Sequence, residues 1–204
     1  MEVGWWGVLI AVLGGAIRIG TPFLFVSLGE CLTEKSGRIN LGLEGTLVMG
    51  AMTGYAVSLH SGSPWLGVLC AGLAGMVLGA LHSWLCSFQR VNDIAVGIAM
   101  MLFGTGLAFF LGKPYIQPSA PRLPSIDLGG WSDVPQLKAA LQINALFLIG
   151  IVVAVLMGWM LKNTAWGLKV RVVGESADAA RALGLQVDRI RILSTAQGGF
   201  LAGI

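Results

Sequence analysis

Charged side chains are scarce in this sequence. Asp, Glu, Lys and Arg make up 11% of its 204 residues, whereas soluble domains carry about 25%. Between these charges the chain is apolar over stretches of about twenty residues, and a helix of that length crosses the hydrocarbon core of a bilayer. The deficit excludes an ordinary soluble domain and predicts an integral membrane protein.

Histidine and cysteine are also few, and neither is spaced as a metal site requires. His60 and His82 lie far apart, and the odd number of cysteines, Cys31, Cys70 and Cys86, does not follow a zinc-site pattern. The sequence has no nucleophile elbow and no phosphate-binding glycine loop followed by lysine. Dispersed basic residues without interleaved aromatics argue against a nucleic-acid partner. We therefore expect no enzyme, no metal and no cofactor bound by this chain.

Apolar segments predict an all-α, polytopic bundle of transmembrane helices in a single domain, 1–204. The expected spans are about 8–28, 41–59, 66–86, 94–111, 143–161 and, incompletely, 192–204. Thirteen helical residues in the last segment reach only about 20 Å, less than the roughly 30 Å of the hydrocarbon core. On this ground the sequence predicts a bundle that is truncated at its C-terminus.

The distribution of Lys and Arg predicts the orientation of the spans. If the spans alternate, the connections 29–40, 87–93 and 162–191 share one side, and they hold most of the basic residues. Basic connections favour the cytoplasmic side. We expect a cytoplasmic loop at 162–191, an extracytoplasmic loop at 112–142 and an N-terminus outside.

Glycine is abundant, with 30 residues in 204. Small residues spaced by four allow two membrane helices to approach closely. This spacing recurs in three pairs, Gly50 with Gly54, Gly75 with Gly79, and Gly199 with Gly203. The pattern predicts close helix packing without identifying the partner of each helix.

A few charged and polar residues stand in or beside the apolar segments. Glu44 either anchors the start of its helix at the interface or lines a polar path, and Asn40, one turn earlier, is expected to share its face. Arg18 lies in the middle of the first span, where we favour internal pairing, with Glu44 as one candidate, over a place on a translocation path. Asn92 and Asp93 are expected to cap the fourth span.

One short helix is predicted inside the 162–191 connection. Ser176 is a good N-cap, the residues from Ala177 to Leu183 favour helix, and Gly184 suits a left-handed end. So short a helix is marginal in water. We expect it to pack against its own membrane domain or against another protein.

These segments resemble a known family. The stretch from Thr33 to Gly45, TEKSGRINLGLEG, is similar to the signature of bacterial ABC-importer permeases of the nucleoside and simple-sugar branch, related to ribose and branched-chain amino acid permeases. Met49–Ala51 and Asn92–Ile98 also fit. Residues 164–180 resemble the segment that couples such permeases to their ATPase. Departures are Arg38, where the family usually has an apolar residue, Cys31, where it often has Leu, and Thr46, where Met is common.

The resemblance implies a function and a set of partners. Such a permease forms the path for a small polar solute, here a nucleoside in preference to a sugar, in the bacterial inner membrane. Its partners are an ABC ATPase that uses the ATP, a second permease subunit, an extracytoplasmic solute-binding protein and the surrounding lipid. Alternatives are a stand-alone channel or secondary transporter, or a truncated non-functional remnant.

Two sets of candidate site residues follow. The translocation path or the family signature is expected to include Arg18, taken from its charge within an apolar span, together with Asn40, Glu44, Asn92 and Asp93. The ATPase-coupling set is Gly174, Glu175, Ala179, Ala180, Arg181 and Gly184.

Overall fold

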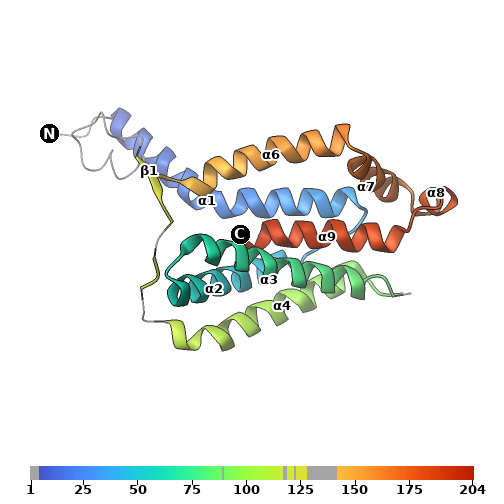
Figure 1. Ribbon diagram of the computed structural model, residues 1–204, viewed down its shortest axis with the longest axis horizontal. Helices are drawn as coiled ribbons and strands as arrows, with labels where there is room; N and C mark the ends of the chain where they lie inside the picture. Colours follow the sequence, from blue (N-terminus) through green and yellow to red (C-terminus); the bar gives the residue numbers. More distant parts are fainter. Residues whose placement is uncertain (1–4, 89, 117–118, 122, 128–141) are drawn as a thin grey trace.

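A bundle of long helices forms the protein (Figure 1). The computed structural model describes residues 5–204 except 89, 117–118, 122 and 128–141. The long helices are α1 (Trp5–Lys35), α2 (Leu43–Ser61), α3 (Pro64–Leu85), α4 (Asp93–Gly112), α6 (Ala145–Asn163) and α9 (Val187–Gly203). The short elements are η1 (Lys113–Tyr115), β1 (Ser125–Asp127), β2 (Gln142–Asn144), α7 (Ala165–Glu175) and α8 (Ala177–Ala182). The predicted all-α class is confirmed.

Within the part of the chain that the structure describes, four helices are long and apolar enough to cross a membrane. They span Gly7–Lys35, Pro64–Leu85, Asp93–Tyr115 and Ala145–Asn163. These ranges contain most of the first, third, fourth and fifth predicted spans. The helices at the other two predicted positions are α2, which starts at Leu43, and α9, which starts at Val187, ahead of the expected residue 192.

The first helix continues beyond its predicted end at residue 28. It runs to Lys35, because nothing in Gly29–Lys35 breaks a helix, and Thr33 Oγ1 donates to the Gly29 carbonyl, 3.1 Å away. The chain turns only at Gly37, whose φ of +80° is a left-handed conformation that glycine adopts without strain. More than half of the predicted 29–40 connection is therefore helical.

The connections between the helices gather at two opposite ends (Figure 1). One end carries residues 36–42, residues 86–88 and 90–92, and the α7–α8 segment. We call it the basic end, because Lys35, Arg38 and Arg90 lie there. At the other end, β1 pairs antiparallel with β2, with Ile126 opposite Ile143. Most of the predicted 112–142 loop lies outside the described residues.

Helix α9 lies at the centre of the bundle, against α3, α1 and α2. A Cβ on Gly199 would overlap the carbonyl oxygen of Gly75, and one on Gly79 would lie 2.5 Å from the carbonyl oxygen of Thr195. A Cβ on Gly203 would overlap the carbonyl of Ala71. Two of the predicted pairs, Gly75 with Gly79 and Gly199 with Gly203, therefore allow close packing, and they determine how near α3 and α9 approach.

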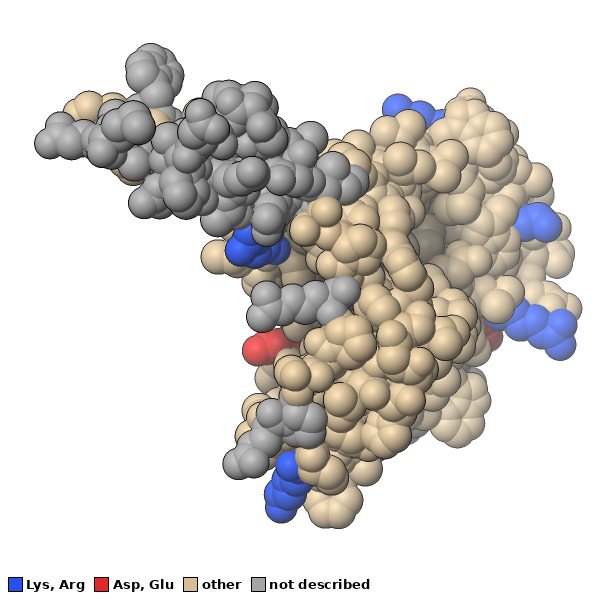
Figure 2. All heavy atoms as spheres, turned by 60° about the vertical axis from the view of Figure 1, so that its left-hand side comes forward, with Lys and Arg blue, Asp and Glu red and all other residues tan. Residues whose placement is uncertain are grey.

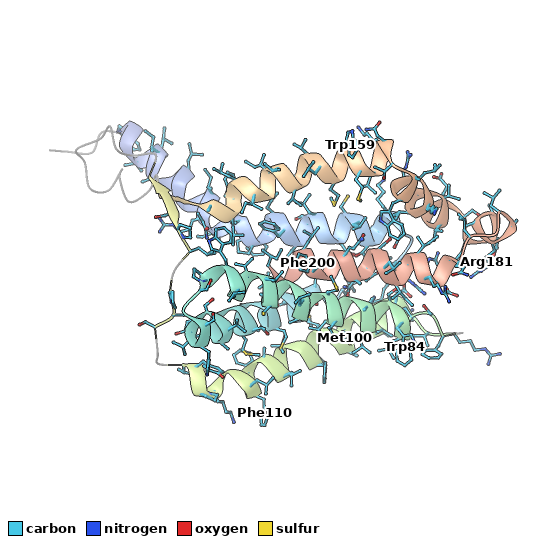
Figure 3. The ribbon with its side chains drawn as sticks, in the orientation of Figure 1. Trp84, Met100, Phe110, Trp159, Arg181 and Phe200 are labelled. Carbon is cyan, nitrogen blue, oxygen red and sulfur yellow. The ribbon has the colours of Figure 1, made fainter. Side chains whose placement is uncertain are left out.

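The outer face of the bundle suits a lipid environment. Figure 2 shows a surface that is almost entirely uncharged, with Lys and Arg at its margins. Large apolar side chains such as Val155 and Phe109 are exposed on it. Trp84 and Trp159 lie on different helices toward the basic end (Figure 3), where tryptophan often marks the membrane interface.

Candidate functional site

The basic end begins with a turn that connects α1 to α2, residues 36–42, which we call the motif loop. Its Asn40 is buried. The backbone N–H of Asn40 donates to Glu30 Oε1 at 3.1 Å, and its side-chain Oδ1 accepts from the N–H of Gly42 at 2.9 Å. Asn40 thus ties the loop back to α1 and prepares the start of α2.

This geometry corrects one expectation about Asn40 and Glu44. The two residues do not share a face, because Asn40 is buried inside the turn whereas Glu44 is exposed in the first turn of α2. Gly42, the residue before that helix, offers no side-chain cap. A carboxylate at this position therefore suits the positive end of the α2 dipole.

Arg38 makes the contact that sequence reasoning missed. Its side chain is only 8% exposed. Nη1 donates to Asp93 Oδ1 at 2.9 Å, and Nη2 donates to Ser87 Oγ at 3.3 Å. The guanidinium therefore joins the motif loop to the α3–α4 connection and to the start of α4. The sequence did offer one indication of this contact, because Arg38 is a departure from the apolar residue that is usual in the permeases the chain resembles.

The predicted cap of α4 is confirmed for Asn92 alone. Its Oδ1 accepts from the N–H of Ile94 at 2.8 Å. Asp93 lies in the first turn, where the helix dipole favours its charge. Its carboxylate binds Arg38. The main structural role of Asp93 is therefore the ion pair that joins the start of α4 to the motif loop.

The other face of the motif loop touches α7 and α9. Arg191 Nε of α9 donates to the Ser36 carbonyl at 3.2 Å. A Cβ on Gly37 would lie 3.1 Å from the Cα of Gly174, and one on Gly174 would overlap the Lys35 carbonyl. The end of α7 is therefore in backbone contact with the end of α1.

Helix α7 was not predicted from the sequence. Thr164 begins it as an N-cap, with its Oγ1 accepting from the N–H of Gly167 at 3.1 Å. Val170 and Val173 are fully buried. They belong to an apolar cluster that draws on α1, α6, α7, α8 and α9 and comprises Leu32, Met157, Leu161, Val170, Val173, Ala180, Val187 and Ile190. This cluster fastens the α7–α8 segment to the bundle.

The short helix α8 forms as predicted. Ser176 Oγ accepts from the N–H of Ala179 at 3.2 Å, and Gly184 has a φ of +77°. Helix α8 lies at the extreme basic end, and Arg181 projects from it (Figures 1 and 3). Arg181 Nη1 donates to Asp178 Oδ1 at 3.0 Å in an exposed pair.

The six residues expected to contact an ATPase separate into two groups. Ala180 is fully buried and Gly174 packs against α1, so neither offers a docking surface. The outward-facing members are Glu175, Ala179, Arg181 and Gly184. Leu183, which the sequence did not single out, is 72% exposed at the tip.

Arg18 is placed differently from its expected position. Its side chain lies on an exposed part of α1, rather than buried in the bundle. The pairing of Arg18 with Glu44 stays a prediction.

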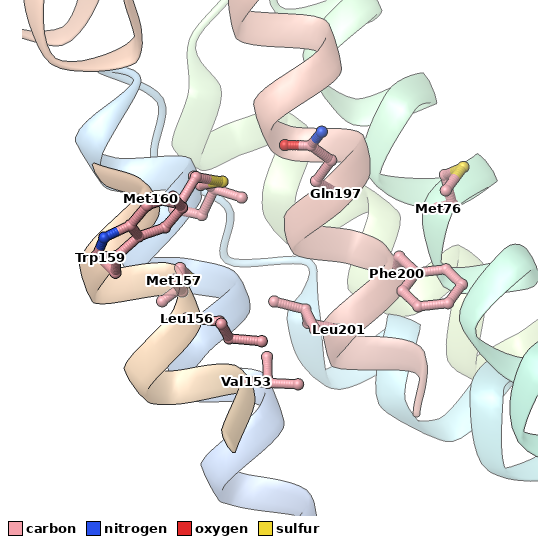
Figure 4. Close-up of a pocket in the computed structure, with 10 residues that line it drawn as sticks. Met76, Val153, Leu156, Met157, Trp159, Met160, Gln197, Phe200 and Leu201 are labelled. Atoms are coloured by element: carbon pink, nitrogen blue, oxygen red, sulfur yellow. The ribbon is translucent and has the colours of Figure 1, made fainter. Parts of the chain in front are cut away.

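An apolar cavity of about 460 Å³ separates α6 from α9. Figure 4 shows side chains of α6, among them Leu156 and Met157, facing Leu201 of α9, whereas Phe200 points to the other side of α9, toward Met76 of α3. Gln197 brings a polar group to the lining, and its Oε1 accepts from Trp166 Nε1 at 3.3 Å. Within the described residues, no three His, Cys, Asp or Glu side chains are grouped as a metal site.

Cys86 and Cys31 are expected to differ strongly in reactivity. Cys86 is buried, and its burial, together with the nearby Asp93 carboxylate, raises the pKa of the thiol to about 12. At pH 8 this thiol stays protonated, and the thiolate is the nucleophile. Cys31 is exposed beside Ser27 and Glu34. Alkylation at pH 8 in mild detergent should modify Cys31 and leave Cys86 free, as read by peptide mass spectrometry.

The control is the same alkylation after unfolding in SDS, where both thiols should react. Equal rates for Cys31 and Cys86 in the folded protein would contradict the burial of Cys86.

Comparison with protein families gives one match over nearly the whole chain. The model described as branched-chain amino acid transport system / permease component matches residues 12–204. Together with the apolar helices, this match makes the chain a multi-pass membrane protein. No solved structure matches the chain.

Curated relatives with similar sequences are permease proteins of ABC transporters. A putative glucose permease of Haloferax volcanii is 30% identical over 94% of this chain and 60% of its own length. A nucleoside permease of Lactococcus lactis is 29% identical over 95% of this chain and 65% of its own length. A guanosine permease of Bacillus subtilis is 26% identical over 97% of this chain and 66% of its own length. The chain thus spans slightly less than two thirds of these relatives.

Proposed function

The chain belongs to the branched-chain amino acid transport system / permease component family, and on that premise we propose that it is a permease subunit of an ATP-driven importer. It forms part of the path for a small polar solute, either a nucleoside or a simple sugar. The names of the relatives, which include a glucose, a nucleoside and a guanosine permease, support this solute class. ATP hydrolysis takes place on a separate ATPase subunit.

The observation that carries the proposal is the construction of the α7–α8 segment. Its inner face, with Val173 and Ala180, is fully buried against the bundle. Its outer face presents Ala179, Arg181 and Leu183 at the extreme basic end. The α7–α8 segment is thus packed tightly against the bundle on its inner face and exposed on its outer face. This arrangement is suited to bind a partner that moves and to transmit the movement to the membrane helices.

The orientation and the remaining partners complete the proposal. The basic end faces the cytoplasm, in keeping with the excess of Lys and Arg there, and the N-terminus lies outside. A second permease subunit completes the path, and a solute-binding protein delivers the solute at the opposite end. The membrane is the bacterial cytoplasmic membrane.

The test is the recovery of an ATPase with the permease. The double variant Ala179→Asp/Leu183→Asp places two carboxylates on the outer face of α8 and leaves the buried Ala180 intact. Loss of a central apolar contact commonly weakens an interface by about 2 kcal/mol or more. We expect at least about tenfold less ATPase to co-purify from mild detergent, measured by mass spectrometry and by ATP hydrolysis.

The matched control is Arg90→Asp, which adds a carboxylate at the same end but on the exposed α3–α4 connection. It should retain the ATPase. Equal recovery from the double variant and the control, or no ATPase with the unaltered chain, would argue against the proposal.

A further inference from the structure

We propose that the motif loop is a second mechanical link, in which Arg38 acts as a positioning residue that carries movement of the α7–α8 segment to α4. This inference rests on the proposed function, since it concerns how an ATPase stroke spreads through the permease. It adds a route through residues 36–42 that is separate from the docking surface on α8.

The loop is held firmly on the side of the α7–α8 segment. Gly174, near the end of α7, is in backbone contact with Lys35 and lies beside Gly37. Arg191 of α9 holds the Ser36 carbonyl. Backbone contacts of this kind leave no flexible side chain to absorb a displacement, so a shift of α7 must shift the loop.

On its other side the loop holds α4. The Arg38 guanidinium binds the first residue of α4, Asp93, and also Ser87 in the α3–α4 connection. Within the loop itself, the backbone of Leu41 also packs on α4, since a Cβ on Gly97 would lie 2.8 Å from the Leu41 nitrogen. A displacement of the loop therefore reaches the cytoplasmic end of α4 both through the ion pair and through close packing.

The ion pair suits a positioning role better than a purely stabilising one. Apolar replacement of a buried ion pair is often neutral or favourable for stability, because desolvation offsets the attraction. A planar guanidinium fixes the direction of two partners at once, and here those partners are Ser87, in the α3–α4 connection, and Asp93, the first residue of α4. Helix α4 packs mainly on α2 and α3, so Arg38 brings its first turn under the influence of α7 and α9.

The experiment measures how much ATP is hydrolysed for each solute molecule imported by the complete importer in proteoliposomes. In Arg38→Met, assembly and ATP hydrolysis should persist, while the ATP-to-solute ratio rises about fivefold or more, the lower end of usual coupling effects. Arg38→Lys keeps the charge beside Asp93 and should restore part of the coupling. Arg90→Met, which removes an exposed charge from the neighbouring connection, should keep the original ratio.

A double variant separates positioning from general damage. If the ion pair carries the effect, Arg38→Met/Asp93→Asn should show the same ratio as Arg38→Met alone, because the interaction is removed only once. An unchanged ratio in Arg38→Met, with uptake intact, would overturn the link and leave the permease function standing. Absence of ATP-driven uptake in the unaltered importer would overturn both.

Discussion

Replacing Gly199 with alanine is expected to destabilise the bundle, although alanine favours helix more than glycine does. The added Cβ would overlap the Gly75 carbonyl oxygen and would lie 3.0 Å from the Cα of Gly79. Both neighbours are backbone of α3, so relief requires α3 and α9 to separate. Over-packing of this kind costs about 1–3 kcal/mol.

The measurement is thermal unfolding in detergent. For a chain of this size, a loss of about 2 kcal/mol corresponds to a fall in Tm of about 4–8 °C. Gly158→Ala on α6 is the matched control, because a Cβ there meets nothing within 4 Å, and its Tm should stay the same or rise. Equal melting temperatures for the two variants would show that α3 and α9 are not so closely packed.

Ala180→Asp is expected to detach the α7–α8 segment from the bundle. Ala180 is fully buried in the cluster that includes Leu32, Val173 and Val187. A carboxylate there has no basic partner among these apolar side chains, and an uncompensated buried charge costs about 3–5 kcal/mol. We expect a large loss of folded protein and rapid proteolysis near residues 176–186.

The neighbouring variant Ala179→Asp provides the control. Ala179 is exposed in the first turn of α8, where the helix dipole favours a carboxylate. Its stability, measured by limited proteolysis and thermal unfolding, should match that of the unaltered chain, even though ATPase binding is expected to weaken. If both variants resist proteolysis equally, Ala180 does not anchor the segment.

Local signals in the sequence predicted much of the basic end. Helix α8 begins after Ser176 and is followed by Gly184, as expected, and Asn92 caps α4. These ends could be predicted because a cap depends on a side chain and on backbone groups within a few residues. The extension of α1 and the presence of α7 were missed. Amphipathic α7 is too short to stand out beside long apolar spans, and its buried face depends on the apolar cluster.

Residues that act over long separations were not predictable in the same way. Arg38 and Asp93 are 55 positions apart, and nothing in either local pattern indicates that their side chains meet. Likewise, Asn40 binds Glu30 rather than accompanying Glu44. In each case the direction of the turn at Gly37 decides the partner, and that turn is set by its contacts with α7 and α9.

By itself, the sequence determined that this is a helical membrane protein, because scarce charge and long apolar stretches leave no other way to satisfy the backbone in lipid. It also determined where several helices begin and end, and its signature stretches indicated the permease family. Only the tertiary structure decided that α9 lies centrally, that Ala180 faces inward while Leu183 faces outward, and that Arg38 joins the motif loop to α4. The physical reason is that these features depend on which helices pack together, and packing depends on surfaces contributed by distant parts of the chain.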